Sequence, residues 1–340
     1  MLALVVSPDG RWAASAASDG TVILWDAHQQ IRSRAAASGK LQDTVSLSFS
    51  HDSERLARAG VDELLVWRID EHGRVSRSTS VIVKGTTIAS CSWSSPTHLS
   101  VVCADATIRI LHGSTFQLLR VLPLASTRTA PDHTKARLKT ILFSPGRWLL
   151  SEKPDSPHDC CLWDIASGKL RKTLRGHSAP VTTAAIDSTG TRLATASMDH
   201  TVRVWEIASA ALVAVLRGHS APVLDVAFSP DGRHVLSASE DKKAKIWPVA
   251  GGECTLSFKH FNWVQAARFS PDGRHVATAS WDHTVRLFKV SDGSLVKRFW
   301  EHEGAPARHV AFSPDGMTLW SGADDGSVAG HSLSNLIRAI

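Results

Sequence analysis

The sequence predicts an all-β protein made of repeated four-stranded antiparallel units. One observation is a repeat, because the stretch 269–288, FSPDGRHVATASWDHTVRLF, has a near copy at 228–247, FSPDGRHVLSASEDKKAKIW. A second is that positions equivalent to Phe269 recur along the whole chain, at Val6, Phe49, Trp93, Phe143, Ile186, Phe228 and Phe312. A period of about 42 residues indicates an array of one supersecondary unit.

A third observation is the order of turns and strands inside each copy. In the seventh copy, a Ser-Pro-Asp-Gly turn at 270–273 precedes a β-prone run at 275–280. A second turn at 281–283 precedes the alternating run 284–288, and the run 294–299 closes the unit. Pro, Asp and Gly each favour a tight turn, and alternation with a period of two indicates strands. Each copy is therefore expected to form four short strands.

Composition supports a folded protein without pointing to an acidic ligand. Hydrophobic residues make up 43% of the chain, which is enough for a large core. The formal net charge is +6, but the basic residues are scattered, and the densest segment, 128–139, is interpreted as a solvated loop. A diffuse excess of this size favours solubility over nucleic-acid binding.

The cysteines and the N-terminus predict a reducing, cytoplasmic environment. The five cysteines, Cys91, Cys103, Cys160, Cys161 and Cys254, are odd in number and form no CxxC pair. This spacing fits reduced thiols better than a disulfide framework or a zinc site. No apolar run reaches membrane-spanning length, and the apolar part of MLALVVSPDG is short for a signal peptide.

The repeats resemble the WD-repeat (WD40) family. The resemblance is carried by Gly176-His177 with Asp199 and Trp205-Glu206, and by Gly218-His219 with Asp241 and Trp247. The pairs Trp25-Asp26 and Trp163-Asp164 match the Trp-Asp dipeptide that ends the repeat motif of this family. The resemblance implies a β-propeller, in which four-stranded antiparallel blades are arranged radially around a channel. Bacterial arrays of this kind often follow a signalling or NTPase module, so a fused N-terminal effector domain outside this chain is expected.

The repeat boundaries predict one propeller over residues 1–340 with eight blades. The units are approximately 1–41, 42–84, 85–134, 135–177, 178–219, 220–260, 261–302 and 303–340. The alternative is seven blades with one terminal unit displaced. Because a first strand begins near Met1 and 336–340 can supply a last one, we expect closure without a shared strand.

A His, a Ser, an Asp and a Trp recur at fixed offsets. In units five to seven the sets are His177, Ser197, Asp199 and Trp205; His219, Ser239, Asp241 and Trp247; and His260, Ser280 and Asp282. Ser, His and Asp together could form a catalytic triad, but a triad occurs once per active site, whereas this set occurs once per repeat. The resemblance implies a structural hydrogen-bonded tetrad that ties the incoming loop to the second and third strands.

The tetrad pattern weakens outside these three units. Leu111 and His331 stand at the Trp position of units three and eight, and Lys40 and Lys84 stand where units two and three would have His. Unit four has an insertion before it, and His133 is the candidate for its loop His. Units five to seven are therefore predicted to be the most stable block, and units three and four the least stable.

The residue before the tetrad Asp differs in every unit, which is expected of a recognition surface. It is Met198, Glu240 and Trp281 in units five to seven. In unit seven, Phe261, Trp263 and Trp300 add aromatic side chains near the same end of the blade. The resemblance places these residues on the narrow face. They are either partner-binding anchors or wedges between blades, with Trp263 and Trp281 expected to be the most exposed.

Three classes of function follow. A non-catalytic protein-interaction scaffold or sensor domain that binds a protein or peptide on the narrow face, without a cofactor, is favoured. A propeller enzyme would need ionisable residues at the channel mouth that do not belong to the repeated set. His331 and His309 are the only candidates of this kind. Motifs of the forms GxxxxGK[ST], GxSxG and HExxH are absent from the sequence. A nucleic-acid-binding propeller would need one strongly basic face.

Overall fold

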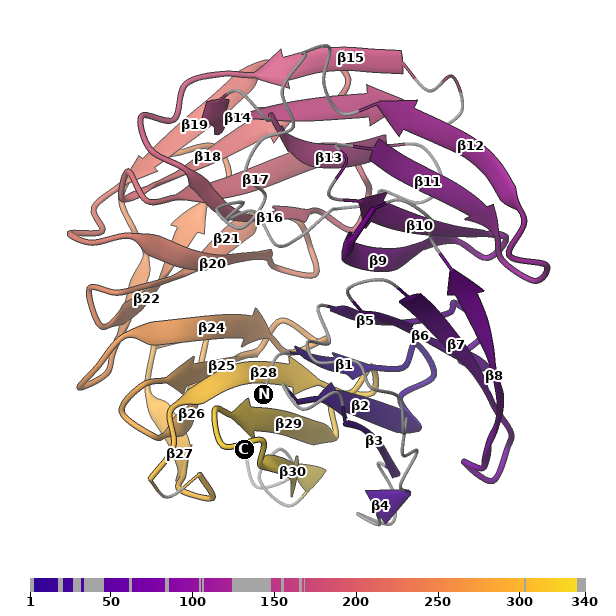
Figure 1. Ribbon diagram of the computed structural model, residues 1–340. Coiled ribbons are helices and arrows are strands. Elements are labelled where there is room, and N and C mark those ends of the chain that lie inside the picture. Colours follow the sequence, from indigo (N-terminus) through magenta and orange to yellow (C-terminus); the bar gives the residue numbers. More distant parts are fainter. Residues whose placement is uncertain are drawn as a thin grey trace. The chain divides into compact units, whose positions relative to one another are not determined.

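A computed structural model describes most of the chain (Figure 1). The described residues are 3–17, 21–26, 32–33, 46–60, 63–82, 86–103, 105, 107–123, 148–153, 156–164, 167, 169–302 and 304–334. The predicted basic loop 128–139, Lys40, Lys84, His133 and the expected last strand at 336–340 lie outside them.

The strands form eight small antiparallel sheets, and strands that are consecutive in the chain are neighbours in each sheet. The first four sheets contain β1 (Ala3–Val6), β2 (Trp12–Ala16), β3 (Val22–Asp26) and β4 (Arg32–Ser33); β5 (Ser46–Phe49), β6 (Arg55–Ala59), β7 (Glu63–Ile69) and β8 (Val75–Ile82); β9 (Ile88–Ser95), β10 (His98–Cys103), β11 (Thr107–His112) and β12 (Leu118–Pro123); and β13 (Trp148–Lys153), β14 (Ser156–Asp164) and β15 (Lys169–Leu174).

The last four sheets repeat the pattern with closely similar strand lengths. They contain β16 (Val181–Ile186), β17 (Arg192–Ser197), β18 (Thr201–Glu206) and β19 (Leu212–Arg217); β20 (Val223–Phe228), β21 (His234–Ser239), β22 (Lys243–Pro248) and β23 (Leu256–Lys259); β24 (Val264–Phe269), β25 (His275–Ser280), β26 (Val285–Lys289) and β27 (Leu295–Phe299); and β28 (Ala307–Phe312), β29 (Thr318–Ala323) and β30 (Val328–Ser332).

These sheets confirm the predicted all-β class with eight blades, numbered here one to eight in chain order. Each blade is built from contiguous chain, so the seven-blade alternative is not supported. The chain forms two compact units. One comprises residues 1–133, 313–322 and 326–340, and the other comprises 134–312 and 323–325.

The Ser-Pro-Asp-Gly turn joins the first two strands through a compact set of hydrogen bonds. In blade seven, the Ser270 hydroxyl donates to the Asp272 carboxylate at 2.5 Å and accepts the backbone N–H of His275 at 2.9 Å. Gly273 has a φ of 71°. Glycine adopts this left-handed conformation without the Cβ clash that other residues meet, which explains the Gly in the repeated turn.

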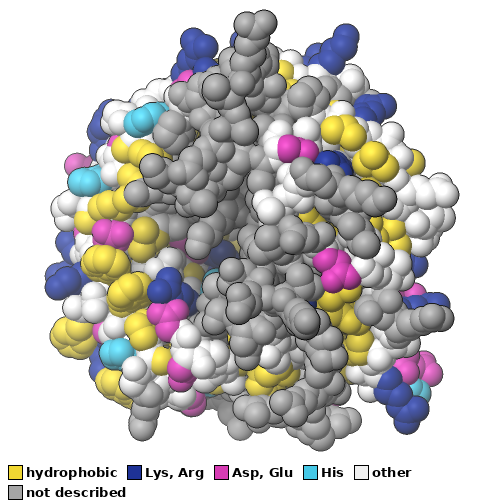
Figure 2. Space-filling model, viewed as in Figure 1, with side chains coloured by type: hydrophobic (Ala, Val, Ile, Leu, Met, Phe, Trp, Pro, Cys, Tyr) yellow, Lys and Arg dark blue, Asp and Glu magenta, His cyan; other side chains and the backbone are white. Residues whose placement is uncertain are grey.

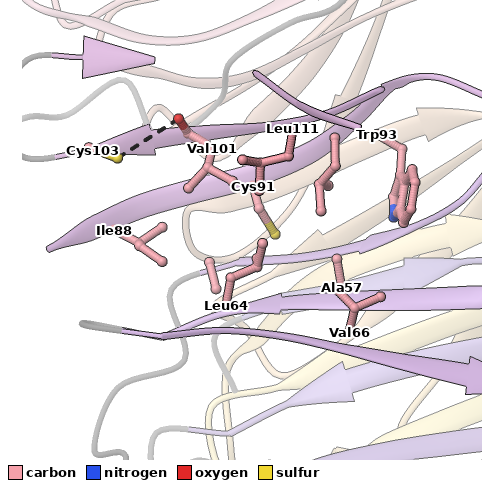
Figure 3. Packing of buried hydrophobic residues seen from close by; sticks show 11 residues of the cluster. Ala57, Leu64, Val66, Ile88, Cys91, Trp93, Val101, Cys103 and Leu111 are labelled. Atoms are coloured by element: carbon pink, nitrogen blue, oxygen red, sulfur yellow. Dashed lines mark hydrogen bonds between the residues drawn. The ribbon is translucent and has the colours of Figure 1, made fainter. Parts of the chain in front are cut away.

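Buried apolar side chains fill the space between successive blades. Such clusters lie between blades one and two, two and three, four and five, five and six, and six and seven. Between blades two and three, Cys91 and Trp93 pack with Leu64, Val66 and Leu111 (Figure 3). A blade cannot bury its own faces, so its core is shared with its neighbours.

The terminal blades meet through packing, as the sequence predicted. In the described chain, β1 pairs with β2, and the sheet of β28, β29 and β30 takes no strand from the N-terminal region. Trp320 of β29 packs instead against Ala13 and Trp25 of blade one. Trp320 is only 2% exposed, so this packing buries a large side chain.

The surface of the described residues carries mixed charge. Lys and Arg side chains are interspersed with Asp and Glu on the face seen in Figure 2. All five cysteines are free thiols, and Cys254 is the one that is not fully buried. Among the described residues, no helix is long and apolar enough to cross a membrane.

Candidate binding face

One end of blades five to seven carries both the repeated polar residues and the variable residues. We call it the His–Asp face, and it consists of the loop before the first strand, the turn between the second and third strands and the end of the fourth strand. Blade seven contributes the loop 260–263, the turn 281–284 and Trp300, which follows β27. Because the strands of a blade are antiparallel, these segments meet at the same end of the sheet.

In blade six, a chain of hydrogen bonds links the loop, the turn and the strands. Nδ1 of His219 lies 2.7 Å from the Asp241 carboxylate, and Nε2 lies 2.7 Å from the hydroxyl of Ser237. The indole N–H of Trp247 donates to the same hydroxyl at 2.8 Å. Because a carboxylate only accepts, Nδ1 is the donor to Asp241, and the Ser237 proton is left for Nε2.

Blades five and seven repeat this chain with small changes. In blade five, the Thr195 hydroxyl lies 2.8 Å from Nε2 of His177 and accepts the Trp205 indole N–H at 2.9 Å. Nδ1 of His177 lies 2.8 Å from Asp199. In blade seven, His260 bridges Asp282 at 3.0 Å and Thr278 at 2.7 Å. Phe288 occupies the Trp position there and packs edge-on against the His260 ring.

The linking hydroxyl differs from the one expected from the sequence. Ser197, Ser239 and Ser280 stand two residues after Thr195, Ser237 and Thr278 on the same strands. Each of these three serines instead donates to a loop carbonyl, at 2.8 Å, 2.9 Å and 3.3 Å. Each also accepts the backbone N–H of the tetrad Asp. Residues two apart share one face of a strand. In blade five, Trp205 pairs with Leu193, and Thr195 is the next residue on that face, so the Trp indole reaches Thr195 before Ser197.

In the repeats with an incomplete tetrad, a Ser hydroxyl on the second strand or its equivalent still contacts the residue at the Trp position. Trp25 donates to Ser15 and Trp163 donates to Ser151, each at 3.0 Å. In blade eight, His331 stands at the Trp position and lies 3.3 Å from the Ser321 hydroxyl. His331 was one of the two candidate active-site residues of a propeller enzyme. It is instead part of a degenerate tetrad.

Burial and hydrogen bonding set the ionisation of the blade-seven pair. Burial acts to raise the pKa of Asp282, but hydrogen bonds from His260, Thr284 and the Phe261 backbone outweigh it and lower the pKa well below its usual range. Burial lowers the pKa of His260, and the bond to Asp282 offsets only part of this. The tetrad Asp is thus a buried carboxylate whose acceptor sites are filled by the fold, which leaves little capacity for proton transfer to a ligand.

Backbone hydrogen bonds hold the variable residue of each blade in an equivalent place. The N–H groups of Met198, Glu240 and Trp281 donate to the carbonyls of Pro180, Pro222 and Trp263 at 2.9 to 3.0 Å. Trp263 therefore stands where blades five and six have Pro. Met198, Glu240 and Trp281 are all partly buried.

Trp263 and Trp281 form a stack that is continued by the next blade. Their ring centroids are 4.8 Å apart, and the guanidinium of Arg308 lies 5.0 Å from the Trp281 ring. The indole N–H of Trp281 donates to Gln265 at 3.1 Å, and Arg308 forms an ion pair with Asp324. Trp281 thus packs between its own loop and the first strand of blade eight, as the wedge interpretation expects.

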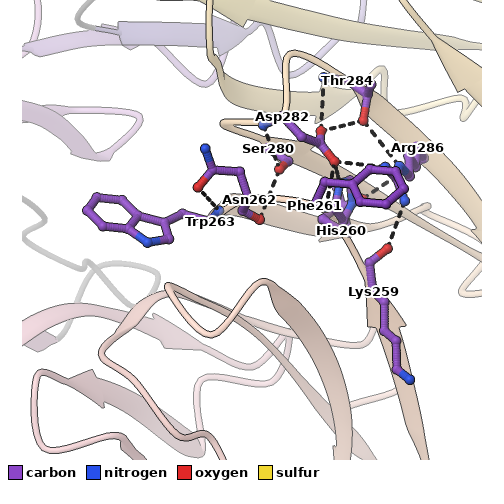
Figure 4. Close-up of polar contacts among 10 residues, drawn as sticks. Lys259, His260, Phe261, Asn262, Trp263, Ser280, Asp282, Thr284 and Arg286 are labelled. Carbon is purple, nitrogen blue, oxygen red and sulfur yellow. Dashed lines mark hydrogen bonds and ion pairs between the residues drawn. The ribbon is translucent and has the colours of Figure 1, made fainter.

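Phe261 and Trp300 are the exposed aromatic residues of this face. Phe261 is 77% exposed and Trp300 is 54% exposed, whereas Trp263 and Trp281 are only partly exposed. The expectation that the last two would be the most exposed was wrong, because Trp281 is covered by its neighbours. Phe261 and Trp263 project in opposite directions from the loop, and Phe261 lies beside Arg286 (Figure 4).

The described residues hold no group of three or more His, Cys, Asp and Glu side chains that could bind a metal ion. The repeated His and Asp instead bind each other and the backbone. What remains on the face for recognition is aromatic surface, cationic side chains and the variable residues.

The family model for "WD domain, G-beta repeat" matches residues 2–26, 168–206, 210–248, 252–289 and 293–329. These segments cover more than half of the chain. The chain therefore belongs to the WD40 family, and the resemblance seen in its repeats is confirmed.

A curated relative shares a short part of the array. The chain is 31% identical over 77 residues to the Periodic tryptophan protein 2 homolog of Schizosaccharomyces pombe. This match covers 23% of the chain and 9% of that protein, so the chain spans only a small part of its relative's length.

Proposed function

We propose that this protein is a non-catalytic scaffold or sensor domain that binds a protein or peptide on the His–Asp face of blade seven. WD40 propellers generally serve as protein-interaction scaffolds, and this chain belongs to that family. The partner, a fused effector domain and a cytoplasmic location are proposals that rest on the sequence.

The observation that carries the proposal is the pair of exposed aromatic side chains, Phe261 and Trp300. Neither occupies a structural position of the tetrad, and the equivalent residues of blade five are Ser178 and Arg217. A few residues carry most of the binding energy at protein interfaces, and large aromatic side chains, Trp above all, are enriched among them. A blade that holds itself together with its own tetrad has these two residues free for a partner.

Peptide selection tests the proposal without knowledge of the partner. A random-peptide phage library is selected on the immobilised protein, and enriched peptides are synthesised for binding measurements. The variant Phe261→Ser/Trp300→Arg introduces the residues of blade five and is expected to lose at least tenfold in affinity. Leu212→Ser, which removes an exposed apolar residue on β19, serves as the control and is expected to bind normally.

Two results would contradict the proposal. One is the absence of any enriched peptide. The other is peptides that bind the double variant as tightly as the unchanged protein, because the binding surface would then lie elsewhere.

A further inference from the structure

Three positions at the outer edge of blade seven depart together from the pattern of its neighbours. We call Phe261, Arg298 and Trp300 the aromatic–arginine patch. The equivalent residues are Ser178, Val215 and Arg217 in blade five and Ser220, Ser257 and Lys259 in blade six. The tetrad needs none of the three changes, because blades five and six form theirs without them.

Arg298 of the patch has a second arginine, Arg286, as its cross-strand neighbour. Arg286 of β26 and Arg298 of β27 are directly opposite in the strand register. Arg286 is fully engaged, because it pairs with Asp282 at 2.7 Å and donates to the Lys259 carbonyl at 2.8 Å. Blades five and six have a cation at the Arg286 position, Arg203 and Lys245, but Val215 and Ser257 opposite it.

Arg298 has no such partner in the structure. Its Nε is buried without a hydrogen bond, and Arg298 forms no ion pair with any of the described residues. The side chain as a whole is only partly buried, so a ligand can reach it. A half-buried guanidinium with an unsatisfied donor, next to a second guanidinium, is costly until an anion binds.

Each of the two guanidinium groups lies within cation–π distance of an aromatic ring. The Phe261 ring lies 5.3 Å from the Arg286 guanidinium, and the Trp300 ring lies 5.1 Å from that of Arg298. A cation–π contact restrains a guanidinium and does not use up its in-plane N–H groups. Those N–H groups match the two oxygens of a carboxylate in a bidentate arrangement.

We propose that the aromatic–arginine patch binds an acidic peptide segment. A Glu or Asp carboxylate of the peptide pairs with Arg298, and neighbouring apolar residues of the peptide pack on Phe261 and Trp300. The proposal rests on the proposed function and specifies the class of its partner. The only acidic group of the blade-seven tetrad, Asp282, is buried and already bound by His260 and Arg286.

The charges farther along the same face favour a peptide over a nucleic acid. Glu240 of blade six and Asp324 of blade eight, which pairs with Arg308, place negative charge at the turns of the two neighbouring blades. A phosphate backbone that extended from Arg298 across the face would meet these carboxylates and bind less well. A peptide with one or two carboxylates can place them at Arg298 and present apolar residues elsewhere.

The test uses matched synthetic peptides. Fluorescein-labelled 12-residue peptides carry one to three Glu residues among Leu, Pro, Gly and Ser, and each has a counterpart with Gln in place of Glu. Binding is measured by fluorescence anisotropy at low and high salt, together with a labelled 12-residue oligo(dT). We expect Glu peptides to bind about tenfold more tightly than their Gln counterparts, and this preference to weaken with salt.

The variants separate charge recognition from folding. Arg298→Gln is expected to abolish the preference for Glu over Gln. Arg298→Lys, which keeps the charge but not the bidentate geometry, is expected to retain part of it. Arg217→Gln, which removes an exposed cation in blade five, is the control and is expected to change nothing. Thermal unfolding shows that each variant is folded.

The possible outcomes distinguish this inference from the proposed function. Peptides that bind regardless of their Glu residues would overturn the acidic-peptide inference and leave the proposed function standing. Failure of every peptide, here and in the phage selection, would overturn both. Tighter binding of oligo(dT) than of any Glu peptide would overturn the inference in favour of single-stranded nucleic acid.

Discussion

Blades six and three solve the same packing problem with different chemistry. At the centre of blade six, Ser237 links His219 to Trp247 in a buried polar chain. In blade three the equivalent positions are Val101 and Leu111, which pack with Cys91 and Trp93 in an apolar cluster (Figure 3). A buried polar chain is sensitive to the loss of any one member, whereas an apolar core responds mainly to changes in volume.

The difference extends to the turn Asp of each blade. The Asp241 side chain is 2% exposed and accepts bonds from His219 and two backbone N–H groups. The Asp105 side chain is 33% exposed and binds Thr107 and Arg109. The contribution of the turn Asp to the stability of the fold therefore depends on how deeply its blade buries it and on how many hydrogen bonds it accepts there.

The largest expected effect is that of removing the buried carboxylate. Asp241→Ala leaves His219 and two backbone N–H groups without their acceptor, and we expect a loss of about 3–5 kcal/mol in the free energy of unfolding. Asp105→Ala breaks a partly exposed interaction and should cost about 1 kcal/mol or less. Denaturant unfolding of the two variants measures both values. Equal losses would remove the distinction between the blades.

A reciprocal exchange at the centre of the two blades should destabilise both. Ser237→Val leaves the Trp247 N–H and Nε2 of His219 unpaired, and Val101→Ser places a hydroxyl among apolar side chains. Each substitution is expected to cost about 1–3 kcal/mol in the free energy of unfolding. If Ser237→Val leaves the free energy of unfolding unchanged, the polar chain of blade six is dispensable. If Val101→Ser leaves it unchanged, blade three tolerates a buried hydroxyl.

Acid is expected to act first on the His260–Asp282 pair of blade seven. The folded pKa of His260 is lowered, because burial disfavours the imidazolium. The unfolded chain therefore takes up this proton first as the pH falls below about 6.5, and the stabilising contribution of His260 is lost as the pH falls further. The pKa of Asp199, Asp241 and Asp282 is lowered as well, because their hydrogen bonds outweigh burial, so their contribution is lost below about pH 4.

Hydrogen exchange measured by mass spectrometry tests this pH dependence. Between pH 7 and pH 4.5, amides of blade seven should lose more protection than amides of blades two and three, after correction for the intrinsic exchange rate. An equal loss in both regions would show that the His260–Asp282 pair does not control acid stability.

The smallest expected effect separates the two hydroxyls of blade five. Thr195→Val removes the link between His177 and Trp205 and should cost about 1–3 kcal/mol in the free energy of unfolding. Ser197→Ala removes bonds near the end of the strand and should cost about 1 kcal/mol. Thermal unfolding ranks the two variants, and the reverse order would restore Ser197 as the central hydroxyl.

The sequence sufficed for the class of fold and for much of the tetrad. The Ser-Pro-Asp-Gly turns and the recurring Trp identified the repeat, because turn chemistry is local. The assignment of the linking hydroxyl to Ser197 was wrong, since Thr195 and Ser197 lie on one face of the strand. Trp205 pairs with Leu193, so the cross-strand register places Thr195 nearer to the Trp205 indole than Ser197. A signal was present, because Ser or Thr recurs ten residues before the Trp position, as in Ser15, Thr195 and Ser237.

The exposure of individual aromatic side chains could not be predicted from one unit. Trp281 is covered by Arg308 of the next blade, and this contact depends on packing between repeats. Phe261 and Trp300 look no more exposed than Trp281 in the sequence. The three-dimensional neighbours of a residue decide which aromatic side chain is available to a partner.

The most direct measurement transplants the outer edge of blade five onto blade seven. The variant Phe261→Ser/Arg298→Val/Trp300→Arg keeps the complete His260–Asp282–Thr278 chain. We predict that its free energy of unfolding stays within about 1 kcal/mol of the unchanged protein, while the affinity for Glu-containing peptides falls at least tenfold. A large loss of stability, or unchanged peptide binding, would contradict the division between a self-sufficient framework and a recognition patch.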